Sequence, residues 1–222
     1  MRIALLGGTG DIGEGLALRL AYDTDHDLVI GSREPQKAEN KAEEYVTELE
    51  SRGTEVSIDG AENADAAQDA DIVVAAVPAY HLTDTIEAVA DSLAEGAVIV
   101  SPAVGMKRDE AGFHYNRPGA GSVTALAAGA APEDVAVVGA FHNLPAGRLA
   151  NLDADLGIDT LVVGDDEDAK STVVDVAEGI EGLRALDAGP LANAAEIEGI
   201  TPLLINVAQN NDGLHDLGVR FD

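Results

Sequence analysis

The chain contains no cysteine among its 222 residues. Disulfides, thiolate metal sites and a cysteine nucleophile are therefore excluded. Neither an H-E-x-x-H pair nor a Ser/His/Asp arrangement occurs, so we expect no metal and no acyl-enzyme chemistry. No run approaches the roughly 18 continuous apolar residues of a membrane span. The chain begins with a strand-like segment that meets a glycine cluster, unlike a signal peptide, and we expect a cytoplasmic protein.

Basic residues are scarce. Thirteen Lys and Arg, only four of them Lys, face 41 Asp and Glu, which gives a net charge of −28. This charge disfavours nucleic acid and anionic membranes as partners. Disorder is not expected, because 46% of the residues are hydrophobic and they recur periodically. An acidic excess with few lysines is typical of proteins kept soluble in concentrated salt, so we favour a halophilic origin over an ordinary acidic enzyme.

Short apolar segments alternate with amphipathic ones over the first 140 or so residues. Strands are expected at residues 2–6, 27–31, 56–58, 71–77, 97–100 and 135–139, and helices directly after the glycine cluster and at residues 35–52, 82–93 and 121–130. This alternation predicts an α/β fold with a Rossmann-type, doubly wound parallel sheet.

The rest of the chain is predicted to form a small C-terminal α/β domain. Its expected elements are a strand at residues 158–163, a helix at 167–180, a strand at 183–186 and a helical stretch at 190–209. We place the division between a Rossmann domain at residues 1–141 and a small domain at 142–222. Residues 101–117 are predicted to be one long polar loop, and loops of that length are uncommon unless they are functional.

A glycine fingerprint follows the first strand. The residues Gly8-Thr9-Gly10-Asp11-Ile12-Gly13 match G-x-G-x-x-G between a strand and a helix. We assign the tight turn to Gly8, approach to a pyrophosphate to Gly10, and close helix packing to Gly13. The alternative is a structural glycine turn. The carboxylate of Asp11 would repel a pyrophosphate, so its side chain is expected to face solvent or to cap the helix.

The end of the second strand indicates which dinucleotide binds. An NAD site usually has an acidic residue there for the ribose hydroxyl. This chain has Ser32 and Arg33, with Lys37 one helical turn later. A hydroxyl and two cations suit the 2′-phosphate of NADP, and Glu34 would have to point away. The alternative is a helix-capping serine beside two solvated cations.

Two further strand ends offer candidate site residues. Val77 and Pro78 end the fourth strand, at the sheet edge where ligands bind in open α/β sheets, and His81 follows on the next loop. The sixth strand leads into residues 141–147, F-H-N-L-P-A-G, whose small side chains would let two flat rings approach each other. On its own, His142 is better explained as a helix-cap or core histidine than as a site residue.

The sequence resembles the F420H2:NADP+ oxidoreductase family over essentially its whole length. The resemblance rests on the opening M-R-I-A-L-L-G-G-T-G-D-I-G-E-G-L-A-L-R-L and on G-S-R at residues 31–33. It rests more specifically on F-H-N-L-P-A-G-R-L-A-N-L-D at residues 141–153 and L-D-A-G-P-L at residues 186–191. Members commonly have Asn at the position of Asp11 and often an aromatic residue at that of Ala79. With the acidic composition, the resemblance suggests a haloarchaeal member.

The resemblance implies a homodimer that moves a hydride between coenzyme F420, a deazaflavin, and NADP. The residues from Thr9 to Ile12 would hold the pyrophosphate, and Ser32, Arg33 and Lys37 the 2′-phosphate. Two further groups would hold the rings: Val77 and His81 beside the nicotinamide half, and His142, Leu144, Ala146 and Leu217 around the deazaflavin and the nicotinamide carboxamide.

The chemistry fits these residues, because hydride transfer between two carbons needs stacked rings more than it needs an acid or a base. His142 is therefore expected to position the ring. Candidate cations for the anionic deazaflavin tail are Lys107, Arg108, Arg117 and Arg148. Two alternatives stay open: another NADP reductase of the same fold, of the imine or β-hydroxyacid type, and a non-catalytic NADP-sensing module.

Overall fold

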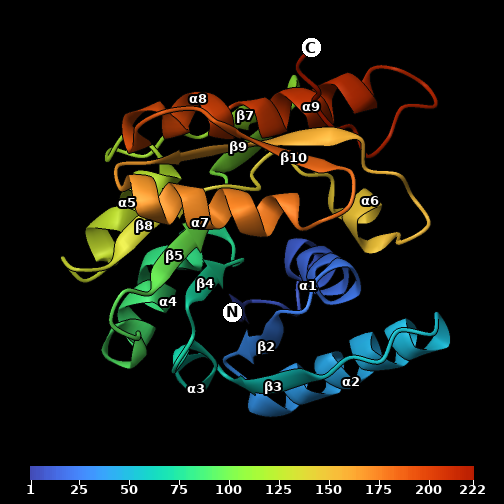
Figure 1. Ribbon diagram of the computed structural model, residues 1–222. Helices are drawn as coiled ribbons and strands as arrows, with labels where there is room; N and C mark the ends of the chain where they lie inside the picture. The colour runs from blue at the N-terminus through green and yellow to red at the C-terminus, as the bar shows by residue number, and fades with distance from the viewer.

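One eight-stranded sheet organises the protein, and the computed structural model describes all 222 residues of it. The strands lie in the spatial order β10-β9-β8-β5-β4-β1-β2-β3 (Figure 1). Their bounds are β1 Arg2–Leu6, β2 Asp27–Ser32, β3 Ile58–Glu62, β4 Ile72–Ala75, β5 Val98–Ser101, β8 Ala136–Gly139, β9 Ile158–Gly164 and β10 Leu183–Asp187. This arrangement confirms the predicted α/β fold of Rossmann type.

Six neighbouring strands of this sheet are parallel to one another, in the spatial order β3-β2-β1-β4-β5-β8. The chain order reverses between β1 and β4, which lie side by side at the centre of the sheet. Strand β9 is antiparallel to β8 through the pairs Val138↔Gly164 and Gly139↔Val163, and β10 is parallel to β9. Ligands bind at such a reversal point, outside the carboxyl ends of the strands.

Successive residues of a strand point to opposite faces, and helices cover both faces of this sheet. In β1, Ile3 and Leu5 join the core cluster that includes residues of α1, α2 and α7, whereas Ala4 and Leu6 face the cluster that includes α3. The helices are α1 Asp11–Asp23, α2 Pro35–Ser51, α3 Asn63–Ala67, α4 Leu82–Val89, α5 Val123–Ala130, α6 Ala146–Ala150, α7 Glu167–Glu178, α8 Ala194–Glu198 and α9 Ile200–Gln209. Three short 3-10 turns complete the set: η1 Ala79–His81, η2 Ala90–Ser92 and η3 Leu191–Asn193. None of the helices combines the length and apolar character needed to cross a bilayer.

Three sequence predictions differ from the structure. The predicted loop at residues 101–117 was wrong in part, because it contains an antiparallel hairpin of β6, Met106–Asp109, and β7, Gly112–Tyr115. Strand β6 is exposed and β7 is half-buried, and the two make a separate two-stranded sheet, so they lack the apolar pattern of a core strand. Strand β3 begins at Ile58 and does not include Val56. The single helical stretch predicted at 190–209 consists of the 3-10 turn η3, followed directly by α8, and of α9 after a break at Gly199.

The sheet continues across the division that we predict between residues 141 and 142. Strands β9 and β10 extend the sheet of the N-terminal segment, and the direction changes at the β8–β9 pair. Figure 1 shows β9, β10, α8 and α9 together at one end of the molecule, with β3 and α2 at the other. The division therefore coincides with a change of strand direction within one sheet, and separate folding of the two parts remains a proposal.

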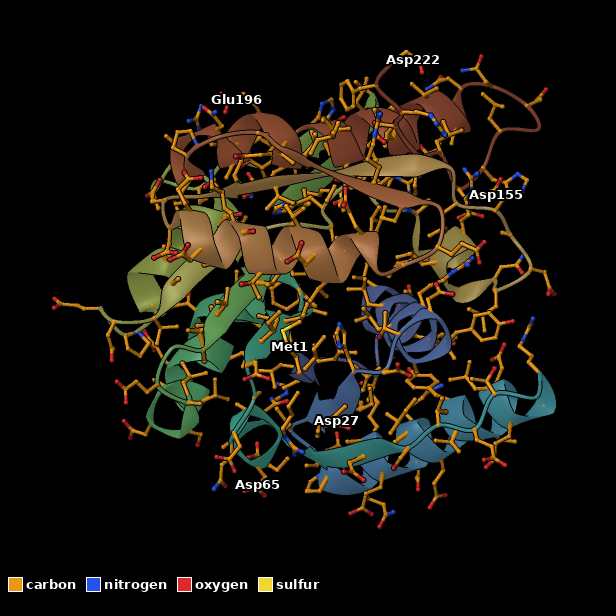
Figure 2. All side chains as sticks on the ribbon, viewed as in Figure 1. Met1, Asp27, Asp65, Asp155, Glu196 and Asp222 are labelled. Atoms are coloured by element: carbon orange, nitrogen blue, oxygen red, sulfur yellow. The ribbon has the colours of Figure 1, made fainter.

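The acidic side chains lie on many sides of the molecule. Asp27, Asp65, Asp155, Glu196 and Asp222 are exposed, and all of them except Asp27 lie toward the outline of the molecule in Figure 2. In dilute buffer the Debye length is about 30 Å at 0.01 M, so such charges repel one another across the whole protein.

We expect the melting temperature to rise between dilute buffer and molar KCl, because screening removes this repulsion from the folded state. Thermal unfolding followed by circular dichroism checks the expectation, with isosmotic glycerol as the control for effects that do not depend on charge. A melting temperature that does not change with KCl would contradict the halophilic interpretation.

Candidate dinucleotide and ring-binding cleft

A large cleft opens at the carboxyl ends of β1, β4, β5 and β8, where the strand order reverses. Its volume is about 910 Å³ and its walls are mainly apolar. Residues 10–12, 76–79, 102–104 and 142–146 follow these four strands and form one side of the cleft. Helix α9 and residues 214–217 of the C-terminal segment form the other side. A cleft of this size and place suits a ligand with a flat ring.

The glycine turn brings β1 and β4 close together. Gly7 has a φ of +75°, and a Cβ on it would lie 2.6 Å from the carbonyl oxygen of Ala76, so only glycine fits. The tight turn that we assign to Gly8 is therefore made by Gly7. A Cβ on Gly13 would lie 2.5 Å from the Cα of Gly8, which confirms that Gly13 permits close packing of α1.

Tyr45 of α2 supports the glycine turn through a side-chain hydrogen bond. Sequence reasoning did not identify it. Its buried hydroxyl donates a hydrogen bond of 2.9 Å to the carbonyl oxygen of Gly8. Burial raises the pKa of the Tyr45 hydroxyl well above its usual range, so it stays a donor. In the sequence, Tyr45 belongs to the apolar stripe of α2 with Ala42 and Leu49, and nothing there distinguishes it from a core residue.

The N-terminus of α1 faces the cleft without a side-chain cap. Gly10 is the N-cap residue, and Gly10, Asp11 and Ile12 lie on the cleft wall. The Asp11 side chain is exposed and does not cap the helix. Of the two placements expected from the sequence, helix cap or solvent-exposed, the second is therefore the one observed. Backbone N–H groups at such a helix end bind anions such as a pyrophosphate.

Beside the turn, β2 ends in the residues that we expect to select NADP. The N–H of Gly7 donates 3.0 Å to the carbonyl oxygen of Gly31, which joins the turn to the end of β2. Ser32 is half-buried and its Oγ accepts from the Glu34 N–H at 3.2 Å. The side chains of Arg33 and Lys37 are exposed and form neither an ion pair nor a hydrogen bond, so both cations are free to receive an anion.

The opposite wall depends on a strained residue after β8. Phe141 is buried with a φ of +66°, a conformation that side chains other than glycine rarely adopt. Its N–H donates 3.0 Å to Oγ1 of Thr160, which holds the strained turn in place. Because of this turn, residues 142–146 leave the sheet and line the cleft.

His142 and Asn143 place acceptor atoms without partners in this wall. His142 is buried, and its Nε2 lies 3.2 Å from Oγ1 of Thr124, whereas its Nδ1 has no partner. Burial lowers the pKa of His142 to about 3, so the ring is neutral at physiological pH. Asn143 donates through Nδ2 to the carbonyl oxygen of Asp159 at 2.7 Å, and its Oδ1 also has no partner. Both acceptor atoms are buried within the wall and are not exposed to the cleft.

The other predicted site residues divide into two groups. Val77, Pro78, Leu144, Ala146 and Leu217 line the cleft. The remaining predicted residues lie outside its wall: Gly8, Thr9, Gly13, Ser32, Arg33, Lys37 and His81. His81 ends the 3-10 turn η1, half-buried, with its ring centroid 4.4 Å from that of the exposed Tyr80.

The four cations predicted as candidates for the anionic deazaflavin tail differ in whether their side chains already have hydrogen-bond partners. Arg117 donates to the carbonyl oxygen of Gly121 at 2.7 Å, and Arg148 to that of Asp155 at 2.9 Å. Lys107 and Arg108 lie on the exposed hairpin directly after Met106, which lines the cleft. The hairpin cations are therefore the better placed pair.

Leu217 reaches the cleft because the C-terminal segment is fastened to β9. Buried Asp159 donates its N–H to Val219 and accepts from the Phe221 N–H, both at 2.7 Å. Arg184 of β10 binds the same carboxylate at 2.8 and 2.7 Å and lowers the pKa of Asp159. Sequence reasoning missed Asp159, because its role depends on a β9–β10 pair that no local pattern fixes.

The strand order, the glycine turn and the open helix end define a dinucleotide-binding protein of Rossmann type. Residues 2–105 match the family model described as NADP oxidoreductase, coenzyme F420-dependent. The F420-dependent NADP reductase of Methanocaldococcus jannaschii is 41% identical over 213 residues, which cover 93% of this chain and 92% of that protein. The corresponding protein of Methanothermobacter thermautotrophicus is 38% identical and covers 100% of this chain and 94% of its own length.

The fold comparison agrees with the sequence comparison. The crystal structure of an F420-dependent NADP reductase candidate from Arthrobacter sp. FB24 superposes with a TM-score of 0.79 at 23% identity, covering 99% of this chain and 98% of that one. The chain belongs to the family of F420-dependent NADP reductases.

Proposed function

We propose that this protein transfers a hydride between reduced coenzyme F420 and NADP+. The observation that carries the proposal is the single apolar cleft with an anion-binding helix end on one side and the His142–Ala146 wall on the other. When bound, the deazaflavin supplies a ring carbon that gives up or accepts a hydride, and the nicotinamide supplies the other carbon. The family relationship supports both coenzymes.

NADP is proposed to lie along the ends of β1, β2 and β4. Its pyrophosphate would bind the backbone from Thr9 to Ile12, and its nicotinamide half would run past Val77 and Pro78, near His81. The 2′-phosphate would bind the Ser32 hydroxyl and the unpaired cations of Arg33 and Lys37, at the end of β2 beside the turn. Asp11 is exposed but lines the same cleft, so its carboxylate would have to point away from the pyrophosphate.

The deazaflavin is proposed to lie against His142, Leu144 and Ala146, covered by Leu217 from the C-terminal segment. The walls around it offer few charges, so water is excluded and the two rings can stack at about 3–3.5 Å. With a pKa of about 3, His142 is a poor general base and is never the charged acid at neutral pH. The chain's contribution is therefore binding, orientation and exclusion of water.

Replacing Arg33 by alanine should raise the KM for NADP by about tenfold or more, with a much smaller effect on NAD, because a charge-assisted contact contributes about 1.5–3 kcal/mol. Initial rates with each dinucleotide at saturating deazaflavin give this comparison. Arg52→Ala serves as the matched control, since Arg52 lies beyond the far end of α2 and pairs with Asp153. Equal losses for NADP and NAD would rule out the 2′-phosphate assignment.

We further propose a homodimer formed through α9. Leu203 and Val207 are one helical turn apart and are 58% and 37% exposed, while the neighbouring Leu204, Ile205 and Ala208 face the cleft. An exposed apolar pair on a helix that also lines the cleft is typical of an interface.

Sedimentation at micromolar concentration should therefore show a dimer, and Leu203→Asp should shift it toward monomer, because a carboxylate would be buried in the interface. Tyr22→Asp introduces the same charge at an exposed apolar residue of α1 and should leave the dimer intact. A wild-type protein that sediments only as a monomer would contradict the proposal.

His142→Ala and His142→Asn should raise the deazaflavin KM by roughly fivefold to a hundredfold and leave kcat within a small factor, as expected for loss of a positioning contact of about 1–3 kcal/mol. Because the pKa of His142 is about 3, the wild-type pH profile should contain no titration of this residue between pH 5 and 8. The measurement is a full kinetic analysis across pH with each coenzyme varied in turn. A kcat loss of about 10² or more at unchanged KM would identify His142 as a general catalyst instead.

A further inference from the structure

A buried carboxylate lies behind the cleft wall and has no role in the site described so far. Glu198, the last residue of α8, is fully buried. Its Oε1 accepts from the N–H and the hydroxyl of Thr124, each at 2.9 Å. Its Oε2 accepts from the N–H of Val123 at 3.0 Å and from the Tyr115 hydroxyl at 2.6 Å. An ionised carboxylate has about four acceptor sites, so these four donors leave no place for a carboxyl proton.

Thr124 connects this carboxylate to His142. The Thr124 hydroxyl has one hydrogen, and it is donated to Glu198. The same oxygen lies 3.2 Å from Nε2 of His142 and can only accept from it. The neutral His142 ring must therefore carry its proton on Nε2, which leaves Nδ1 as a lone-pair acceptor.

The ring is also held from other sides. A Cβ on Gly139 would lie 3.0 Å from Cε1 of His142, so the ring lies close against the end of β8. The His142 carbonyl oxygen accepts from the Thr201 hydroxyl at 2.7 Å. Backbone and side chain are thus both fixed before any ligand binds, as a positioning group requires.

We infer that Glu198, acting through Thr124, fixes His142 in the Nε2–H form and so holds the ring in the orientation that supports the deazaflavin side of the cleft. The inference rests on the proposed function, because it deepens the role given there to His142. Glu198 and Thr124 are positioning residues, since neither is expected to touch the coenzyme. Nδ1 of His142 is buried without a partner, so the contact with Thr124 is the one hydrogen bond that orients the ring.

The test is Thr124→Val, which keeps the shape of the side chain and removes the hydroxyl. Nitrogen NMR of protein labelled in its five histidines reports which ring nitrogen carries the proton, and His142→Asn assigns the signal. In the wild type, His142 should be in the Nε2–H form. In Thr124→Val its signals should change, and the Kd for the deazaflavin alone, from a fluorescence titration, should rise about three- to tenfold. Thr124→Ser should restore both.

Tyr115→Phe is the matched control. It removes another hydrogen bond from the same carboxylate, but Tyr115 does not contact His142. This variant should lose stability like Thr124→Val while it keeps the wild-type His142 signals and deazaflavin Kd. Equal effects of the two variants would reduce Glu198 to a structural role and overturn the inference.

Two further outcomes would also overturn it. One is a wild-type His142 protonated on Nδ1. The other is a Thr124→Val protein with altered His142 signals but an unchanged deazaflavin Kd. If the wild type binds NADP but no deazaflavin, the proposed function fails. The NMR result still reports the Glu198–Thr124–His142 contact separately.

Discussion

The buried guanidinium of Arg19 fixes the two sides of the cleft relative to each other. Arg19 lies in α1, the helix whose N-terminus faces the cleft, and it donates to four backbone carbonyl oxygens of the segment that follows the His142–Ala146 wall. These acceptors are Leu149 at 3.0 Å, Arg148 at 3.3 Å, and Asn151 and Ala154 at 2.7 Å each. Burial lowers the pKa of Arg19, and the nearby carboxylates of Asp23 and Glu181 oppose this shift. Gly15 allows the close approach, since a Cβ there would lie 2.5 Å from the Cβ of Leu149.

This connection matters because hydride transfer depends on the distance between two rings more than on a reactive side chain. One ring is proposed to be held through α1 and the glycine turn, and the other by the wall that Arg19 joins to α1. An error of about 1 Å between two such sites can cost a factor of 10² in rate. A buried guanidinium with four carbonyl partners resists such an error better than a flexible loop contact would. Two further features also hold the cleft walls in place: the strained turn at Phe141 on the deazaflavin side, and the hydrogen bond from Tyr45 to Gly8 on the NADP side.

The sequence predicted most of the sheet, because parallel strands buried on both faces have strong local signals and the G-x-G-x-x-G motif fixes the first turn. It also named most of the wall after β8. It did not find Gly7 as the tight turn, the β6–β7 hairpin, or the support from Tyr45, Thr124, Asp159 and Glu198. Each of these depends on contacts between residues far apart in the chain; Glu198 meets Thr124 across 74 positions, for example. Such polar residues look like ordinary helix or strand positions until the packing brings them together.

Of the 41 acidic side chains, only Asp159 and Glu198 are buried. Each supports one of two consecutive wall residues. Glu198 acts on His142 through Thr124. The backbone oxygen of Asp159 accepts a hydrogen bond from the Asn143 side chain, and its carboxylate binds the C-terminal segment. Salt screens exposed charges strongly and buried pairs much less. The exposed carboxylates can therefore set how stability depends on salt without disturbing the two that shape the cleft. The surface carboxylates and the two buried carboxylates therefore have different roles: the first set the dependence of stability on salt, and the second hold the cleft wall in place.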